Sequence, residues 1–379
     1  MSLQQYYHKR LALADMAAER FSIVPLQEDM LVAATGGAAL GSLLTQSYPD
    51  AFILCAGPLG GSFAPASGMA VATFPLDGAL CRLPVLQGFG AMLRQCGVDA
   101  LALTGRAETP LSLRLSRGTG RLERAKTLRY PDYTRAAQRA ELLAETQDGN
   151  AALLLAGASS TSLRGAGMHL GSAQQASLLA GALHDRNCAA LVLEGGSALP
   201  PVPLPADTPL RARLFSEACF AQEIAACGAR LPAGMLWKSA ACYHCPAPCQ
   251  AWIKSSSGSY VFCADHQGFA ALLDACGAAA PDALAACDML GLDPLAAAPL
   301  LKGAAAADIS AILEKELEEY PGNGQPAAQE AYTESMQAGM ILGICPHLLR
   351  GHPSVSLDDI FGLLDDDLRR QFPAALALA

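Results

Sequence analysis

Charged and aromatic residues are scarce in this chain. Of its 379 residues, 16% are Asp, Glu, Lys or Arg and 6% are Phe, Trp or Tyr. Acidic residues outnumber basic ones by 35 to 26, which gives a net charge of −9. Nucleic acids and anionic membranes both bind to a basic protein face, so we expect neither as the main partner. No run approaches the roughly 18 uncharged apolar residues of a membrane span, so we expect none.

Small apolar residues and cysteine are abundant instead. Hydrophobic residues make up 52% of the chain, which assures a large buried core. At roughly 150 residues per domain, its length favours two domains and allows three. The first ten residues, MSLQQYYHKR, do not have the pattern of a secretion signal. Thirteen cysteines without such a signal indicate reduced thiols plus a metal site, in a reducing cytoplasm.

Three of the cysteines form a C-x2-C-P-x2-C run at Cys242, Cys245 and Cys249. Thiolates at this spacing are typical ligands of an iron–sulfur cluster or of zinc. A fourth ligand must come from elsewhere, and the best candidate is Cys345, which proline also follows. The spacing leaves three readings open: a cluster, a structural zinc completed by His244 or Cys345, or buried thiols alone.

Short apolar runs bounded by Gly or Pro recur through the first 200 residues and are typical of buried strands. The phrase Ile53–Gly57 is echoed by Leu153–Gly157, and a helical stretch and another strand follow in each half. This repetition predicts a pseudo-twofold β domain. The expected strands are Ala51–Ala56, Met69–Phe74, Ala100–Thr104, Leu111–Leu115, Ala151–Ala156 and Ala189–Glu194, and the expected helices are Leu86–Cys96 and Ala173–Arg186.

A proline-rich segment, Pro200–Pro205, is a stiff linker and marks the predicted domain boundary. We therefore predict a β-rich N-terminal domain at residues 1–205 and one or more helical domains at residues 206–379. The C-terminal part has the composition of helices, with few β-branched residues. Its expected helices are Leu210–Cys227, Gly268–Cys276, Asp282–Leu290, Pro294–Ala306, Ile309–Tyr320, Ala327–Met340 and a last one, capped near Ser356, that runs to about Arg370.

Three groups of motifs follow one another along the chain. The first comprises Ala56–Gly61, Ala64–Gly68, Pro75–Gly78, Phe89-Gly90 and Gly97–Ala100. The second is the cysteine trio, and the third pairs Asp288–Asp293 with Leu342–Cys345. In this order they resemble the aldehyde ferredoxin oxidoreductase family of tungstopterin enzymes, whose last two motifs read D-x-x-G-L-D and D-x-x-G-L-C.

The resemblance implies an α+β fold, with an N-terminal pseudo-twofold domain of two β-sheets followed by a mainly α-helical region. It also implies a [4Fe-4S] cluster beside a tungstopterin centre that oxidises aldehydes or related substrates and passes electrons to ferredoxin. The implied cluster ligands are Cys242, Cys245, Cys249 and Cys345. If a pterin binds, its contacts are expected at Asp288, Gly291, Leu292 and Asp293; without one, Gly291 is explained as a left-handed helix cap.

The chain departs from the family where the pterin phosphates should bind. The family's early arginine falls on Ala38, the cation expected after Gly68 is Met69, and the Asp that should open the second paired motif is Met340. Loss of one charge-assisted phosphate contact costs about 1.5–3 kcal/mol, so several losses weaken binding by powers of ten. We therefore expect the tungstopterin site to be degenerate.

Three functional hypotheses result. In the first, the chain is a cytoplasmic protein with a [4Fe-4S] cluster and an electron-transfer or oxidoreductase role, which works with ferredoxin or another redox protein as a homo-oligomer or as a subunit of a complex. In the second, it is a non-catalytic scaffold or binding protein with zinc or no metal. In the third, it is an active tungsten-dependent aldehyde oxidoreductase with an atypical pterin site. No catalytic residue is defined by the sequence.

Overall fold

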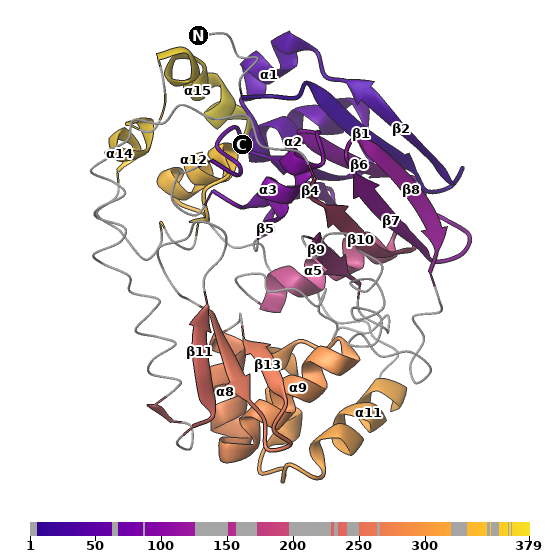
Figure 1. Cartoon of the computed structure of the whole chain (residues 1–379), viewed down its shortest axis with the longest axis vertical. Coiled ribbons are helices and arrows are strands. Elements are labelled where there is room, and N and C mark those ends of the chain that lie inside the picture. The colour runs from indigo at the N-terminus through magenta and orange to yellow at the C-terminus, as the bar shows by residue number, and fades with distance from the viewer. Residues whose placement is uncertain are drawn as a thin grey trace.

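The computed structural model of the chain has two bodies (Figure 1). The upper body in that view holds the strands of the N-terminal half and the last helices of the chain, and the lower body holds β11 to β13 with α8, α9 and α11. The structure describes residues 6–62, 67–85, 88–125, 151–156, 173–196, 229–230, 234–240, 250–263, 266–319, 332–346, 349, 356–362, 364 and 366–379.

The first sheet has six strands in the order β2-β1-β6-β3-β4-β5. Strands β1 and β6 run parallel, and all other neighbours run antiparallel. Helices α1 (Glu28–Ala34) and α2 (Gly37–Ser47) connect β2 to β3, and α3 (Phe89–Gln95) precedes β6. The strands are β1 (Arg10–Asp15), β2 (Arg20–Pro25), β3 (Phe52–Ala56), β4 (Ala70–Leu76), β5 (Ala79–Val85) and β6 (Ala100–Thr104).

The second sheet has four strands in the order β8-β7-β10-β9. Its strands β7 and β10 run parallel, β7 and β8 form a hairpin, and β9 runs antiparallel to β10. It therefore repeats the β2-β1-β6-β3 part of the first sheet strand for strand, which confirms the predicted duplication. Its elements are β7 (Leu111–Ser116), β8 (Thr119–Arg124), β9 (Ala151–Leu155), α5 (Ala173–His184) and β10 (Cys188–Glu194).

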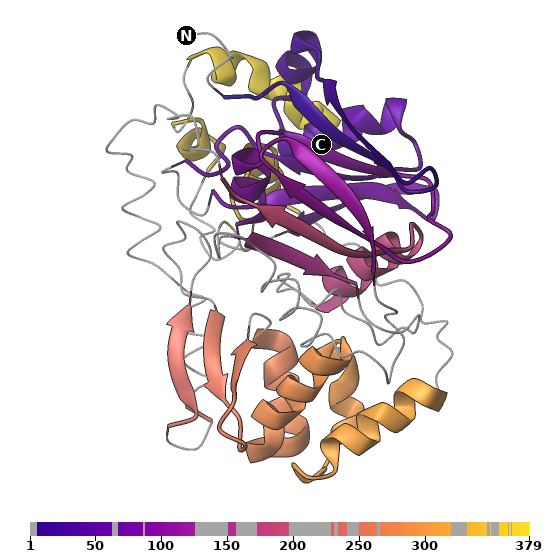
Figure 2. The same cartoon turned by 45° about the vertical axis from the view of Figure 1, so that its right-hand side comes forward.

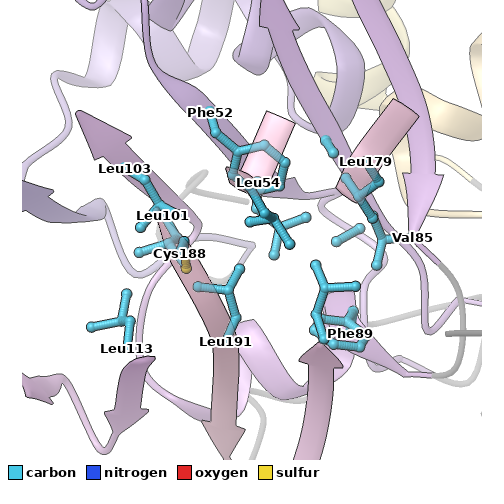
Figure 3. Packing of buried hydrophobic residues seen from close by; sticks show 14 of the residues in the cluster. Phe52, Leu54, Val85, Phe89, Leu101, Leu103, Leu113, Leu179, Cys188 and Leu191 are labelled. Atoms are coloured by element: carbon cyan, nitrogen blue, oxygen red, sulfur yellow. The ribbon is translucent and has the colours of Figure 1, made fainter. Parts of the chain in front are cut away.

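The two sheets enclose an apolar core that also includes α3 and α5. Figure 3 shows Phe52 and Leu54 of β3 on the same side as Leu191 of β10 and Phe89 of α3. Alternate residues of a strand point to opposite faces, so Ile53 lies in a different core on the other face of the sheet. Burial of each large apolar side chain contributes about 1.5–3 kcal/mol.

The other face of the first sheet is covered by helices from both ends of the chain. Helices α1 and α2 share this core with α12 (Glu334–Leu342), α14 (Leu357–Phe361) and α15 (Asp366–Leu378). Phe372 of α15 is fully buried there and stacks edge-on against Phe361 of α14. Helices α12, α14 and α15 are therefore packed onto the N-terminal sheet, an arrangement that the sequence did not predict.

The lower body has its own core, in which a three-stranded sheet packs against helices (Figure 2). The stretch Gln267–Leu290 has the length and apolar composition of a membrane span. It folds, however, as two helices separated by a 3₁₀ turn, and much of it lies in this core. The elements are β11 (Leu236–Ala240), β12 (Gln250–Lys254), β13 (Tyr260–Cys263), α8 (His266–Cys276), η2 (Gly277–Ala279), α9 (Ala280–Leu290), α10 (Pro294–Ala297), η3 (Ala298–Leu301) and α11 (Ile309–Glu319).

The expected α+β architecture is confirmed, with some differences in detail. Every strand predicted in the N-terminal half is present within two residues of its expected bounds. The helix expected at Pro294–Ala306 is shorter and continues as a 3₁₀ turn, because Pro299 interrupts it. The last helix is divided in two after Gly362, although Ser356 caps its start with a full capping box as expected. The Pro200–Pro205 linker and the predicted boundary lie outside the described residues.

Candidate functional site

A glycine-rich turn follows β3 directly, and we call it the glycine loop (Gly57–Ser62). It is closed by backbone hydrogen bonds from Gly60 to Gly57 (2.9 Å) and from Ser62 to Leu59 (2.9 Å). The hydroxyl of Ser67 donates to the Ser62 carbonyl over 2.8 Å, which ties the loop to the strand that follows. All of these residues are buried, so the loop forms a rigid, dry turn.

The side chain of Arg94 is hydrogen-bonded to the backbone of this loop. It extends from α3, is 1% exposed, and its Nη1 donates to the carbonyls of Pro58 (2.7 Å) and Gly57 (3.4 Å). Its Nε and Nη2 atoms are buried and have no hydrogen-bond partner among the described residues. Burial lowers the pKa of Arg94, and the nearby Asp99 raises it, but an arginine remains charged in proteins. A buried cation, two of whose donor atoms have no partner in the described part of the chain, therefore lies beside the glycine loop.

The loop and α12 meet through backbone atoms rather than side chains. A Cβ at Gly57 would overlap the carbonyl carbon of Leu342 and the amide nitrogen of Gly343. A Cβ at Gly37 would overlap the carbonyl oxygen of Met340. The amide of Leu59 donates to the Leu342 carbonyl over 3.1 Å. Glycine is required at both positions because the two backbones approach so closely.

Cys345 lies just beyond this contact. Helix α12 ends at Leu342, Gly343 adopts the left-handed conformation (φ 87°), and the amide of Ile344 donates back to Gly339 over 2.8 Å. The thiol of Cys345 is 8% exposed and belongs to the core beneath the first sheet. Burial raises the pKa of Tyr332, and the negative charge of the Cys81 and Cys345 thiolates raises it further.

The three clustered cysteines, Cys242, Cys245 and Cys249, lie outside the described residues. The strands on either side of them are described: β11 ends at Ala240, which pairs with Gln250 at the start of β12. These paired ends of the hairpin point toward the upper body in Figure 1. Among the described residues, no group of three or more His, Cys, Asp or Glu side chains gathers to hold a metal ion.

The D-x-x-G-L-D residues form the turn between α9 and α10. Gly291 caps α9 in the left-handed conformation (φ 74°). The Oδ1 atom of Asp293, 6% exposed, accepts from the amides of Leu295 (2.7 Å) and Ala296 (3.3 Å) and caps α10. Leu292 is buried in the lower core, and Asp288 is half-buried on the last turn of α9.

The residues found here fit a tungstopterin poorly. Pterin phosphates need cations and open backbone amides, but Ala38 and Met69 are buried and apolar. The close approaches at Gly37, Gly57 and Gly90 are all made to the protein's own backbone, so these glycines do not leave an open cradle. A [4Fe-4S] cluster needs four thiolates, which is the donor set that the sequence offers.

Sequence reasoning missed Arg94 and Tyr332. Arg94 lies between the quoted motifs Phe89-Gly90 and Gly97–Ala100, on a helix whose preceding residues are all small or apolar. A lone charge in such a stretch was the available signal, because a charge is seldom buried without a specific role. Tyr332 carried no comparable signal, because its position depends on contacts between distant segments.

Comparisons with known proteins agree with this architecture. Residues 11–196 match the family model described as the aldehyde ferredoxin oxidoreductase N-terminal domain. A chain of the solved active site complex BamBC of benzoyl coenzyme A reductase, bound to 1,5-dienoyl-CoA, has a similar fold, with a TM-score of 0.56 and 12% identity. The alignment covers 84% of the present chain and 61% of that chain. No match is found among curated proteins. Residues 11–196 of this chain are therefore similar to the aldehyde ferredoxin oxidoreductase N-terminal domain.

Proposed function

We propose that this chain is an aldehyde ferredoxin oxidoreductase-like protein that binds one [4Fe-4S] cluster and acts in electron transfer or as an oxidoreductase. The proposed ligands are Cys242, Cys245, Cys249 and Cys345. The observation that supports the proposal concerns the described strand ends on either side of the trio in the sequence. Strands β11 and β12 meet there, at Ala240 and Gln250, and this end of the pair points toward the upper body, to which the buried Cys345 belongs.

We also propose that the tungstopterin site of the family is degenerate in this chain. This part of the proposal is supported by the buried apolar side chains of Ala38 and Met69 and by the glycines that pack against backbone. In such a protein the cluster would carry electrons between partner proteins. Ferredoxin or another redox protein in the cytoplasm is the proposed exchange partner. The solved structural neighbour is part of a complex, which supports a role as a subunit or an oligomer.

Cysteine variants of anaerobically prepared protein test the proposal. The wild type should be brown, contain about four irons per chain, and give the EPR signal of a reduced [4Fe-4S] cluster. Cys242→Ser and Cys345→Ser should each lose this signal, whereas Cys263→Ser, at a buried thiol in the lower core, should keep it. A colourless wild type, or stoichiometric zinc with no iron, would refute the proposal and favour a scaffold role.

A second candidate, an active tungsten enzyme with an atypical pterin site, is favoured by one observation. The Nε and Nη2 donors of Arg94 are buried beside the glycine loop with no partner among the residues that the structure describes, and a phosphate group could accept from both. About one tungsten per chain in the purified protein, lost in Arg94→Met, would support this candidate over the degenerate site.

A further inference from the structure

We propose that the buried guanidinium of Arg94 binds a small monocarboxylate, such as formate or acetate, through its Nε and Nη2 atoms. Two other polar side chains, those of Thr35 and His8, come from segments that border the same place. The site goes beyond the proposed function, because it requires neither a cluster nor any of the clustered cysteines.

Arg94 differs from another buried arginine, Arg186, in how its nitrogen atoms are used. Arg186 is 6% exposed, and its Nε, Nη1 and Nη2 atoms donate to the carbonyls of Leu103, Ala182 and Asp50, respectively. Arg94 is 1% exposed and donates from Nη1, while Nε and Nη2 have no partner among the described residues. The N–H groups of Nε and Nη2 lie along one edge of the planar guanidinium and point the same way. This edge matches the two oxygens of a carboxylate.

The carboxylate of Asp99 does not accept from this edge in the described part of the chain. Its Oδ1 and Oδ2 atoms accept from the backbone amides of His8 (3.1 Å) and Arg10 (3.2 Å). The negative charge of Asp99 nevertheless acts on Arg94, whose pKa it raises against the effect of burial. Excess charge is costly in a dry interior, so a ligand with one negative charge suits this place better than one with two.

The backbone of the glycine loop is less suited to phosphate than to a carboxylate. Proteins commonly hold phosphate with several backbone N–H groups at once. The four amides that follow Pro58 all donate to carbonyls of the protein itself, and they belong to Leu59, Gly60, Gly61 and Ser62. A carboxylate needs only the two parallel donors that the arginine edge supplies.

Thr35 lies beside the same loop and is fully buried. Its hydroxyl has no hydrogen-bond partner among the described residues. The next residue is Gly36, whose Cβ would be 2.8 Å from Cδ of Pro58, and Arg94 donates to the Pro58 carbonyl over 2.7 Å. Thr35 and Arg94 therefore approach the loop at the same residue.

The backbone of Thr35 is strained, which fixes where its hydroxyl lies. With φ 61° and ψ −48°, Thr35 forms a γ-turn that the amide of Gly36 closes by donating to Ala34 over 2.6 Å. A β-branched residue rarely adopts this conformation, and strain of this kind is concentrated at functional sites.

His8 is the third polar side chain at this place and is half-buried. It follows Tyr7, whose hydroxyl donates to the Thr35 carbonyl. In the described part of the chain, seven buried side-chain nitrogen or oxygen atoms have no hydrogen-bond partner, and four of them belong to Arg94, Thr35 and His8. Because His8 is the most exposed of the three, we place the entry of the ligand on its side.

Thermal melting of anaerobically prepared protein tests the site, in sodium acetate at about pH 7.5 against sodium chloride of equal ionic strength. A ligand of the folded state raises the Tm in a saturable way, and we expect this of acetate with the wild type. Arg94→Lys keeps the charge but not the parallel donors, so its apparent Kd for acetate should be weaker by about tenfold or more. Arg186→Met, the matched control at an arginine whose nitrogens are all occupied, should keep the wild-type Kd.

Three results would overturn the proposal. Equal melting of the wild type in acetate and chloride would show that Arg94 serves the fold alone. An unchanged Kd in Arg94→Lys would show that acetate binds elsewhere. A saturable effect of inorganic phosphate that Arg94→Lys weakens would assign the edge to a phosphate group instead. None of these results depends on iron content, so each leaves the proposed cluster untouched.

If Arg94→Lys does not fold, hydrogen exchange on the wild type decides. Saturating acetate should slow exchange in residues 57–62 and 89–95 and leave α9 and α11 of the lower body unchanged. Equal exchange in both segments with and without acetate would overturn the proposal.

Discussion

The amide of Leu59 donates to the carbonyl of Leu342 over 3.1 Å and joins the loop after β3 to the last turn of α12. These residues come from opposite ends of the chain. The bond explains why α12 belongs to the N-terminal body, and it places the buried Cys345 next to the glycine loop. The arrangement leads to several measurable consequences for stability and for cysteine reactivity.

Removal of the Arg94 guanidinium should loosen the glycine loop. Arg94→Met leaves the buried carbonyls of Gly57 and Pro58 without this donor, which should lower the free energy of unfolding by about 1–3 kcal/mol. Arg94→Lys should lose less, because an ammonium group retains a charged donor. Urea denaturation measures both, with Arg121→Met at an exposed site of β8 as control. Equal stability of Arg94→Met and wild type would contradict the supporting role of Arg94.

The stability of the fold should fall as the pH is lowered through the histidine range. Burial lowers the pKa of His8 below 6.5, the charges of Arg94 and Arg10 lower it further, and Asp99 and a hydrogen bond to the Arg94 backbone oppose the shift. Below pH 6.5 the unfolded chain gains a proton at His8 that the folded chain does not bind, so acid favours unfolding. The stability from this residue is full above pH 6.5 and is lost as the pH falls toward the folded pKa.

Thermal melts of the wild type and of His8→Gln, at about pH 7.5 and pH 5.5, measure this effect. The wild type should lose more stability on acidification than His8→Gln, which cannot take up the proton. The same loss in both proteins would show that other groups, such as carboxylates, account for the whole pH dependence.

Buried thiols should resist alkylation in the native protein. Burial raises the pKa of Cys81 to about 11 and the pKa values of Cys96 and Cys188 to about 12. Each therefore remains protonated near neutral pH, and a protonated thiol is a poor nucleophile. Mass spectrometry after iodoacetamide treatment at about pH 8 should find these three unlabelled in the native state and labelled in urea. Rapid native labelling of any of them would contradict the packing described for the strands.

The carboxylate of Asp293 should stabilise the lower body by capping α10. Asp293→Ala removes the acceptor for the amides of Leu295 and Ala296 and should cost about 0.5–2 kcal/mol. Asp293→Asn should retain most of this stability, because asparagine caps helices nearly as well. Chemical denaturation of the three proteins gives the comparison, and an alanine variant as stable as the wild type would mean that the cap contributes nothing.

The N-terminal half could be predicted well because its signals are local. Strands β3 and β9 are short apolar runs ended by glycine, and each reads as a strand without reference to the rest of the chain. The duplication followed from the echo of Ile53–Gly57 in Leu153–Gly157. By contrast, strands β11 to β13 were missed. Strands β11 and β12 mix polar and apolar residues without strict alternation, and β13 is only four residues long.

The residue types of the candidate site could be predicted from the sequence. The contacts that hold the glycine loop against α12 and Arg94 could not. Cysteine spacing indicates a metal site because the chemistry of thiolates restricts what such a spacing can do. The contact between Gly57 and Leu342 has no comparable signal, since glycine occurs 35 times in the chain and nothing local pairs these two positions. Burial of Arg94 likewise depends on the fold of the loop above it.

Elemental analysis of protein purified without oxygen tests the central claim most directly. Iron, zinc, tungsten and molybdenum are measured together and divided by the protein concentration. The account predicts about four irons per chain and essentially no zinc or tungsten. About one zinc per chain, no metal at all, or about one tungsten per chain would contradict it.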